Sequence, residues 1–168
     1  PSSLESISQY AFNGCKSLAT ITIPSSVKTI EEGAFMNCSS LKQIILPIGL
    51  NKISTNTFQG CSSLSGVIIP SSVTEIGARA FSMCYSLRQI TIPSSVTIIC
   101  KKAFFKCNSL ERVNLSSSLK TIKWHAFNSC FSLKEIFIPS SVEIIEDFAF
   151  GYCGLEKINF KLPSSLRK

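Results

Sequence analysis

The chain alternates short apolar segments with short polar ones, and this alternation repeats every 23 residues along almost the whole sequence. Within each repeat a leucine is followed three and five residues later by further apolar residues, as in Leu87, Ile90 and Ile92. Alternating residues rich in isoleucine indicate a short β-strand with one buried face. Proline usually follows, and it ends the strand because it cannot donate a hydrogen bond to a neighbouring strand. The pattern therefore predicts one short strand in each repeat.

The repeat is defined by residues that recur at the same step. The unit reads P-S-S-[VL]-x-x-I-x-x-x-A-F-x-x-C-x-S-L-x-x-I-x-I. A step of about 20 to 50 residues is the signature of a solenoid, in which stacked coils bury a continuous core. Seven cysteines keep the step, each three residues after a phenylalanine: Cys15, Cys38, Cys61, Cys84, Cys107, Cys130 and Cys153.

The segment A-F-x-x-C is too short for a long helix, and we expect one helical or 3-10 turn there on the convex side. Stacking places the strands side by side, about 4.8 Å apart. The sequence therefore predicts an α/β solenoid in which residues 1–168 form one domain. We expect about seven 23-residue coils, one parallel sheet and short helical or 3-10 turns on the convex side. The coils start near Pro1, Pro24, Pro47, Pro70, Pro93, Ser116 and Pro139.

The motif L-x-x-I-x-I-P-x-S-[VL]-x-x-I is a variant of the leucine-rich repeat. The added A-F-x-x-C-x-S-L resembles the BspA-like class, found in bacterial surface proteins and in large families of parasitic protists. The likeness extends from Pro1 to about Phe160, with few departures: Ser116 replaces the proline, Thr57 replaces the alanine, and a residue is missing after Cys153. The resemblance implies a leucine-rich-repeat fold and a surface protein concerned with adhesion or host contact.

Neither end of the sequence shows an atypical capping repeat. A coil buries its apolar faces only against its neighbours, and terminal coils normally carry a polar cap. We therefore expect the chain to be a fragment of a longer array, with its ends covered by further repeats or by a neighbouring subunit.

Cysteine at one position of every coil predicts a column of thiols inside the stack. Parallel Cα–Cβ vectors do not suit the dihedral angle of a disulfide, and zinc sites need clustered ligands that this spacing lacks. We expect buried thiols that behave as small apolar groups. Cys100 lies outside the column beside Lys101 and Lys102. An incidental surface thiol is one interpretation, and a thiol made reactive by those cations is the alternative.

The chain has 17 Lys and Arg against 10 Asp and Glu, for a formal net charge of +7. Between Arg79 and Lys134 nine basic residues stand against Glu111 alone. Such a patch attracts acidic proteins, polyanions or phosphates, although solvated side chains that only keep the array soluble are the alternative. We find no aromatic stacking platform or DNA-reading motif, and we expect no nucleic-acid partner. The candidate basic flank on the convex side comprises Arg79, Lys101, Lys102, Lys106, Lys123 and His125.

The middle residue of each I-x-I segment faces outward on the predicted concave side of the sheet. Ile45 and Ile68 are neighbours there beside Gly66, and Phe137 lies further along. Contiguous apolar residues on a rigid sheet are typical of a protein-binding surface, although β-branched residues also suit an exposed strand. The candidate binding residues on this side are Ile45, Ile68, Arg112 and Phe137.

The sequence contains no Gly-rich phosphate loop, no H-E-x-x-H motif and no nucleophile elbow, and His125 has no carboxylate close to it in sequence. We therefore expect no catalytic residue, cofactor or metal site. No apolar run approaches the roughly 20 residues that span a bilayer, so we expect no membrane insertion. The leading hypothesis is a non-catalytic protein-interaction module at the cell surface. The alternative is a cytoplasmic or cytoskeletal repeat protein packed in a larger, acidic assembly.

Overall fold

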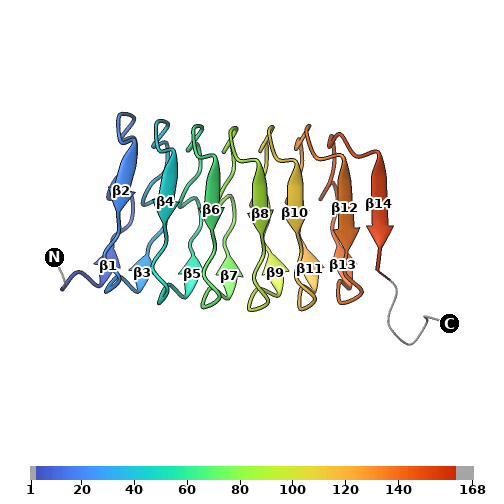
Figure 1. The fold of residues 1–168 in the computed structure, drawn as a ribbon, viewed down its shortest axis with the longest axis horizontal. Helices are drawn as coiled ribbons and strands as arrows, with labels where there is room; N and C mark the ends of the chain where they lie inside the picture. The colour runs from blue at the N-terminus through green and yellow to red at the C-terminus, as the bar shows by residue number, and fades with distance from the viewer. Residues whose placement is uncertain (1–2, 162–168) are drawn as a thin grey trace.

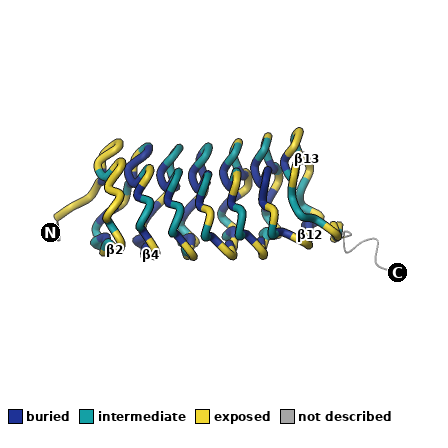
Figure 2. The backbone as a smooth tube through the Cα atoms, turned by 90° about the horizontal axis from the view of Figure 1, so that it is seen from above, coloured by how far each residue is buried: buried dark blue, intermediate teal, exposed yellow. Residues whose placement is uncertain are grey.

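The computed structural model describes residues 3–161, which form seven stacked coils in a nearly straight row (Figure 1). The predicted leucine-rich-repeat solenoid is therefore confirmed. Seen from above, buried stretches recur at matching places in successive coils, and the first coil is largely exposed (Figure 2). Because the row is nearly straight, the face expected to be concave is nearly flat.

Each coil contributes two parallel strands rather than one, so the prediction of a single sheet is wrong. The extra strand forms at the first isoleucine of the repeat and the residue before it, a pattern too short to predict a strand from sequence. The longer strands are β2 (Thr20–Thr22), β4 (Gln43–Ile45), β6 (Gly66–Ile68), β8 (Gln89–Thr91), β10 (Arg112–Asn114), β12 (Glu135–Ile138) and β14 (Lys157–Phe160). The short strands are β1 (Ser6–Ile7), β3 (Thr29–Ile30), β5 (Lys52–Ile53), β7 (Glu75–Ile76), β9 (Ile98–Ile99), β11 (Thr121–Ile122) and β13 (Ile144–Ile145).

Residues 3–161 contain no helix, so the expected α/β class and the helical or 3-10 turns are wrong. Every second amide of the turn segment donates to the next coil, as Phe12 N–H does to the Ala34 carbonyl at 2.8 Å. The amides between them close local turns, as Asn13 N–H does to the Tyr10 carbonyl at 2.9 Å. A helix needs each of these amides for a bond within its own segment. Bonding between stacked coils therefore replaces the helix.

This alternation places residues with positive φ on both sides of the A-F-x segment. Glycine and asparagine adopt this left-handed conformation most easily, and other residues do so at a cost of roughly 1–2 kcal/mol. Glycine fills the first such position of the second coil, where a Cβ on Gly33 would collide with the Tyr10 ring. The non-glycine residues with positive φ are Tyr10, Asn37, Asn56, Arg79, Met83, Lys102, Lys106, His125, Ser129, Phe148 and Tyr152.

The core consists of columns that run the length of the row. Seven phenylalanine rings, from Phe12 to Phe150, stack with centroids 5.1–5.6 Å apart and ring planes within 15° of parallel. Beside them the six cysteines that keep the 23-residue step from Cys38 to Cys153 each donate their Sγ–H to a phenylalanine carbonyl of the preceding coil, at 3.0–3.3 Å. Offset stacking and fully buried aromatic area make such a column a main source of stability.

The predicted thiol column is confirmed for the five cysteines from Cys38 to Cys130, which are buried. It is wrong for Cys15, which is exposed, and for Cys153, which is partly buried. Each of these two lies in an end coil and has a neighbouring coil on one side only among the residues described. Burial of a thiol in this fold therefore needs a coil on both sides.

The residue missing after Cys153 does not shift the strands out of register. β14 still pairs with β12 so that Ile158 lies beside Ile136. The shortened turn passes through Gly154, where a Cβ would collide with the Phe131 carbonyl oxygen. The deletion is absorbed in the turn, and the sheet is preserved.

Candidate functional site

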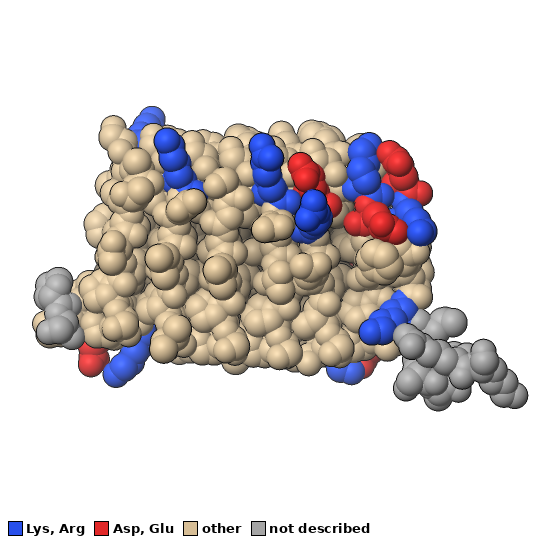
Figure 3. All heavy atoms as spheres, in the orientation of Figure 1, with Lys and Arg blue, Asp and Glu red and all other residues tan. Residues whose placement is uncertain are grey.

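The outward residues of the seven longer strands form one continuous surface, which we call the strand face. Strand alternation turns the first and third residues of each strand outward and buries the second, as in the exposed-buried-exposed pattern of β4. Ile45 and Ile68 lie side by side in paired strands and are 82% and 85% exposed. Figure 3 shows charged side chains along the upper and lower margins of this face and an uncharged band between them.

Gly66 leaves a notch in this band beside the two isoleucines. A Cβ built on Gly66 would have no neighbour within 4 Å. The resulting hollow of about 330 Å³ is lined by the glutamines Gln43 and Gln89 together with Ile45 and Ile68. The strand face thus offers an uncharged, partly apolar recess between two side-chain amides, which suits one apolar side chain of a protein partner.

Phe137 is exposed as predicted, at 63%, but the structure does not bring it to the two isoleucines. Thr91 and Asn114, on β8 and β10, lie between them and hydrogen-bond to each other at 3.1 Å. Phe137 instead helps to line a separate hollow of about 620 Å³, which also contains Pro139 and Phe160. The strand face therefore carries two apolar areas separated by a polar one.

Arg112 begins β10 and is exposed at the charged margin of the strand face. No carboxylate in residues 3–161 lies within ion-pair distance of it, whereas Glu135 one coil further pairs with Lys157 at 3.2 Å. Hydrogen bonds from Asn159 and Lys157 stabilise the Glu135 carboxylate and lower its pKa. Arg112 is thus available to an external carboxylate, as are Lys42 and Arg88 on the same margin, which also form no ion pair among the described residues.

A second surface follows the turns that connect the short strands to the longer ones, and we call it the turn edge. The six residues of the basic flank gather here over three adjacent coils, since Arg79 N–H donates to the Lys101 carbonyl and Lys102 N–H to the Trp124 carbonyl. None of the four ion pairs among the described residues includes a member of this flank. The turn edge comprises residues 8–14, 31–37, 54–60, 77–83, 100–106, 123–129 and 146–152.

Aromatic rings support these cations, which the sequence analysis missed. The Lys102 Nζ lies 4.6 Å from the centre of the Trp124 ring and 5.3 Å from that of Phe105, and the Lys106 Nζ lies 5.4 Å from the latter. His125 stacks on Phe148 with ring centres 5.2 Å apart. Because attraction to the ring holds each ammonium in place, the flank presents ordered positive charge. The repeat itself carried this signal, since the 23-residue step places Trp124 one coil after Lys101, next to Lys102.

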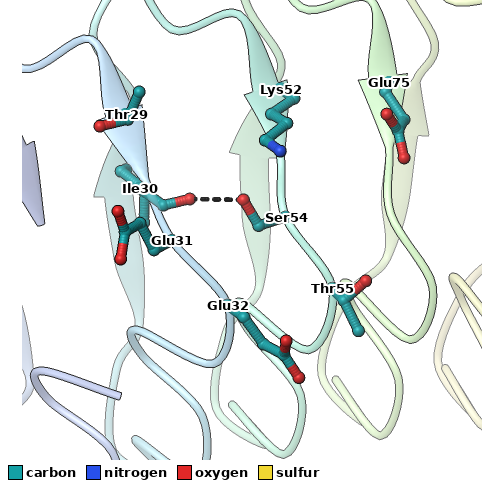
Figure 4. Close-up of a pocket in the computed structure, with 8 residues that line it drawn as sticks. All are labelled: Thr29, Ile30, Glu31, Glu32, Lys52, Ser54, Thr55 and Glu75. Carbon is teal, nitrogen blue, oxygen red and sulfur yellow. Dashed lines mark hydrogen bonds between the residues drawn. The ribbon is translucent and has the colours of Figure 1, made fainter. Parts of the chain in front are cut away.

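The other half of the turn edge is acidic. Figure 4 shows Glu31 and Glu32, which follow β3, around a hollow of about 380 Å³ with Glu75 of β7 and Lys52 of β5. The Glu32 carboxylate accepts hydrogen bonds from the Tyr10 hydroxyl and the Asn56 amide, at 3.2 and 3.3 Å. None of the three carboxylates takes part in an ion pair among residues 3–161. Three carboxylates and one ammonium leave this hollow negative.

Burial suppresses the reactivity of the thiols. Loss of hydration raises the pKa of Cys38 to about 11 and that of Cys61 to about 12, and it raises those of the other buried thiols as well. The pKa of Cys100 is also raised, by burial and by Glu75, although Lys123 acts in the opposite direction. The alternative of a thiol activated by nearby cations at Cys100 is therefore wrong, because burial outweighs the nearby lysine.

The sequence matches the family described as "BspA type Leucine rich repeat region", in 6 copies over residues 1–108 and 51–168. A leucine-rich repeat protein from Bacteroides ovatus is 39% identical, with a TM-score of 0.89, over 97% of this chain and 42% of its own. One from Eubacterium ventriosum is 30% identical, with a TM-score of 0.83, over 100% of this chain and 44% of its own. The leucine-rich repeat protein of T. pallidum is 32% identical, with a TM-score of 0.76, over 97% of this chain and 73% of its own.

No curated protein matches the sequence. Residues 3–161 include no helix with the length and apolar character needed to pass through a bilayer. Leucine-rich repeat arrays generally mediate contacts between proteins and are generally not catalysts. With the family's motif over the whole sequence and its coil in the structure, this chain belongs to the BspA-type leucine-rich repeat family.

Proposed function

We propose that this chain is a non-catalytic protein-interaction module whose strand face binds a protein partner in adhesion or host contact at the cell surface. The observation that carries the proposal is the apolar area around Ile45 and Ile68, both more than four-fifths exposed on a rigid sheet. Exposed apolar area of this kind is costly unless a partner covers it. The Gly66 notch and the neighbouring amides would orient the bound segment.

The test is binding of the fluorescently labelled chain to cultured epithelial cells, measured by flow cytometry. The double variant Ile45→Asp, Ile68→Asp should bind at least about tenfold more weakly, since two charges would enter the apolar contact. Ile144→Asp is the matched control, because Ile144 is also an exposed strand isoleucine but lies in the row of short strands. Equal binding by all three proteins would remove the strand face from the proposal.

The location of the protein is tested separately on intact source cells. Surface exposure predicts that an impermeant label and an added protease reach the repeat without lysis. Protection until lysis would instead support the second candidate, an intracellular repeat protein packed in an acidic assembly such as a cytoskeletal lattice. The ordered, unpaired cations of the basic flank favour that candidate, and salt-sensitive co-sedimentation with the assembly would test it.

We also propose that further coils continue the array beyond the residues described. The exposed apolar side chains of the last coil, among them Ile145 and Ile158, support this, as does the greater length of the two relatives matched over less than half of their chains. Fusing a coil of the repeat consensus after the seventh should raise the free energy of unfolding, measured by urea denaturation. An unchanged or lower value would contradict the proposal.

A further inference from the structure

The turn edge carries opposite charges in its two halves, and Glu32 and Lys101 occupy the same position of their coils. Glu31 and Glu32 lie in the second coil, and Lys101 and Lys102 lie in the fifth. Between them the third and fourth coils present short side chains at the same place, Thr55 and Ala78. An acidic cluster, a small-residue centre and a basic cluster therefore follow one another along a single edge.

We propose that the turn edge binds a second copy of this chain, with the two rows of coils antiparallel and a two-fold axis between the third and fourth coils. In such a dimer each position of a coil faces the same position of the partner's coil, because the axis runs along the coil direction. The second coil faces the fifth and the third faces the fourth. This surface is additional to the strand face of the proposed function and does not depend on it.

The pairing brings the acidic cluster of each copy to the basic cluster of the other. Glu32 faces Lys101 of the partner subunit, and Glu31 and Lys102 lie beside this contact. The side chain of Lys102, which the Trp124 ring holds in place, faces Gly33 of the partner subunit, where the Tyr10 ring lies over the backbone. The acidic hollow of about 380 Å³ that Glu31 and Glu32 line can receive the ammonium groups. Each contact occurs twice, since the interface is related to itself by the axis.

The charges concerned are not neutralised by an opposite charge within the described part of their own chain, although Glu31 and Glu32 accept hydrogen bonds there. None of Glu31, Glu32, Glu75, Lys101 and Lys102 belongs to an ion pair there, although the same chain forms four other ion pairs on its surface. At the axis Thr55 faces Ala78 of the partner subunit, and next to them Asn56 faces Arg79 of the partner subunit, so the longer side chain sets the spacing between the backbones there. Charge complementarity together with a recess at the acidic end is what distinguishes a self-complementary face from a patch that only aids solubility.

Sedimentation velocity of the protein tests the proposal first. We expect a dimer at about 0.01 M salt that dissociates toward about 1 M, where the screening length falls to about 3 Å. The double variants Glu31→Lys, Glu32→Lys and Lys101→Glu, Lys102→Glu should each be monomeric at concentrations where the unaltered chain dimerises. Lys16→Glu, Lys42→Glu is the control, because it reverses two exposed lysines outside the charge pairs and should leave the dimer intact.

Mixing the two double variants gives the decisive result. In the mixed dimer the basic clusters of one variant face the acidic clusters of the other, so both charge contacts are restored, one with its original signs and one with its signs reversed. Native mass spectrometry should show the mixed dimer at least about tenfold more abundant than either homodimer. The quadruple variant should form homodimers again, which also shows that the substitutions leave the fold intact.

Three results would overturn the proposal. The first is a chain that stays monomeric at low salt and high concentration, and the second is a mixture that yields no mixed dimer. The third is a dimer that persists in both charge variants but is lost in Ile45→Asp, Ile68→Asp, which would assign self-association to the strand face. Quenching of the single Trp124 by polyglutamate without self-association would assign the basic flank to a different acidic partner.

Discussion

The first three coils and the next three have the same core residues and the same backbone conformation, but they differ in the side chains that they present on the turn edge. In the first half, glycine and asparagine occupy most of the left-handed positions, among them Gly33, Asn37 and Gly60. In the second half those positions hold large side chains such as Arg79, Met83 and Lys102. Unfavourable backbone conformations persist where the side chain is needed. The comparison indicates that the core residues determine the backbone conformation of the coil, whereas the residues of the turn edge vary with the surface that they present.

The core should contribute equally in both halves, and truncation of its rings gives the largest expected effect. Phe35→Ala and Phe104→Ala each remove a fully buried ring from the same stack. We expect each variant to lose about 3–5 kcal/mol of unfolding free energy, measured by urea denaturation. A difference of more than about 1.5 kcal/mol between them would break the equivalence of the two halves.

The columns of this core were predictable from sequence, whereas the turn edge was not. Phe, Cys and Ile recur because every coil buries side chains of the same size at the same places. Their regular spacing along the sequence therefore predicts the solenoid. The left-handed positions tolerate Arg79 and Met83 as well as glycine, and so they show no constant residue. In the sequence, only the glycines and asparagines of the first three coils indicate the left-handed conformation at these positions. The exposure of Ile45, Ile68 and Phe137 followed from strand alternation. The 23-residue step already placed Thr91 and Asn114 between the isoleucines and Phe137. The role of these three apolar residues in binding stays a prediction.

Alkaline pH tests the thiol column in both halves. Folded Cys61 ionises at a pKa of about 12 against an ordinary value of 9.0, so folding favours the protonated thiol. The stabilisation is complete below pH 9.0 and declines as the pH rises toward 12. Each fully buried thiol should lower the unfolding free energy by at most about 1.4 kcal/mol per pH unit in that range. Urea denaturation at several pH values measures the slope.

Two alanine variants compare the halves in the same experiment. Cys61→Ala and Cys107→Ala each remove one buried thiol, one from either half, and each should flatten the slope by the same amount. A slope that neither variant changes would show that other groups cause the alkaline loss of stability.

Exchange of left-handed residues between the halves has a smaller expected effect. Met83→Gly relieves the backbone cost of a side chain at positive φ and should raise the unfolding free energy by about 0.5 kcal/mol. Gly60→Met should lower it by at least about 1 kcal/mol, because a Cβ there would also collide with the Asn37 side chain. Thermal denaturation compares both with the unaltered chain. If Met83→Gly is destabilising, the methionine side chain contributes more by packing than it costs in conformation.

The contact between Lys102 and Trp124 gives the smallest expected effect. Lys102→Met keeps the length of the side chain but removes its charge, and it should cost about 0.5–1 kcal/mol. A double-mutant cycle with Trp124→Leu isolates the coupling, and the fluorescence of the single tryptophan reports the same contact. Additive effects of the two substitutions would show that the ring does not hold the ammonium.

Because the coils are interchangeable, a mutation that changes their number can leave the fold intact. The same Phe, Cys and Ile side chains meet wherever two coils pack together. A gain or loss of the 69 nucleotides that encode the 23 residues of one coil therefore adds or removes a whole coil without disturbing the core. Such an event between the second and fifth coils would move the acidic and basic clusters apart or together by about 4.8 Å. Two copies of the altered length would still match each other across a two-fold axis, but they would mismatch the original length. The number of coils would then determine the choice of partner, so that related chains dimerise with chains of their own length.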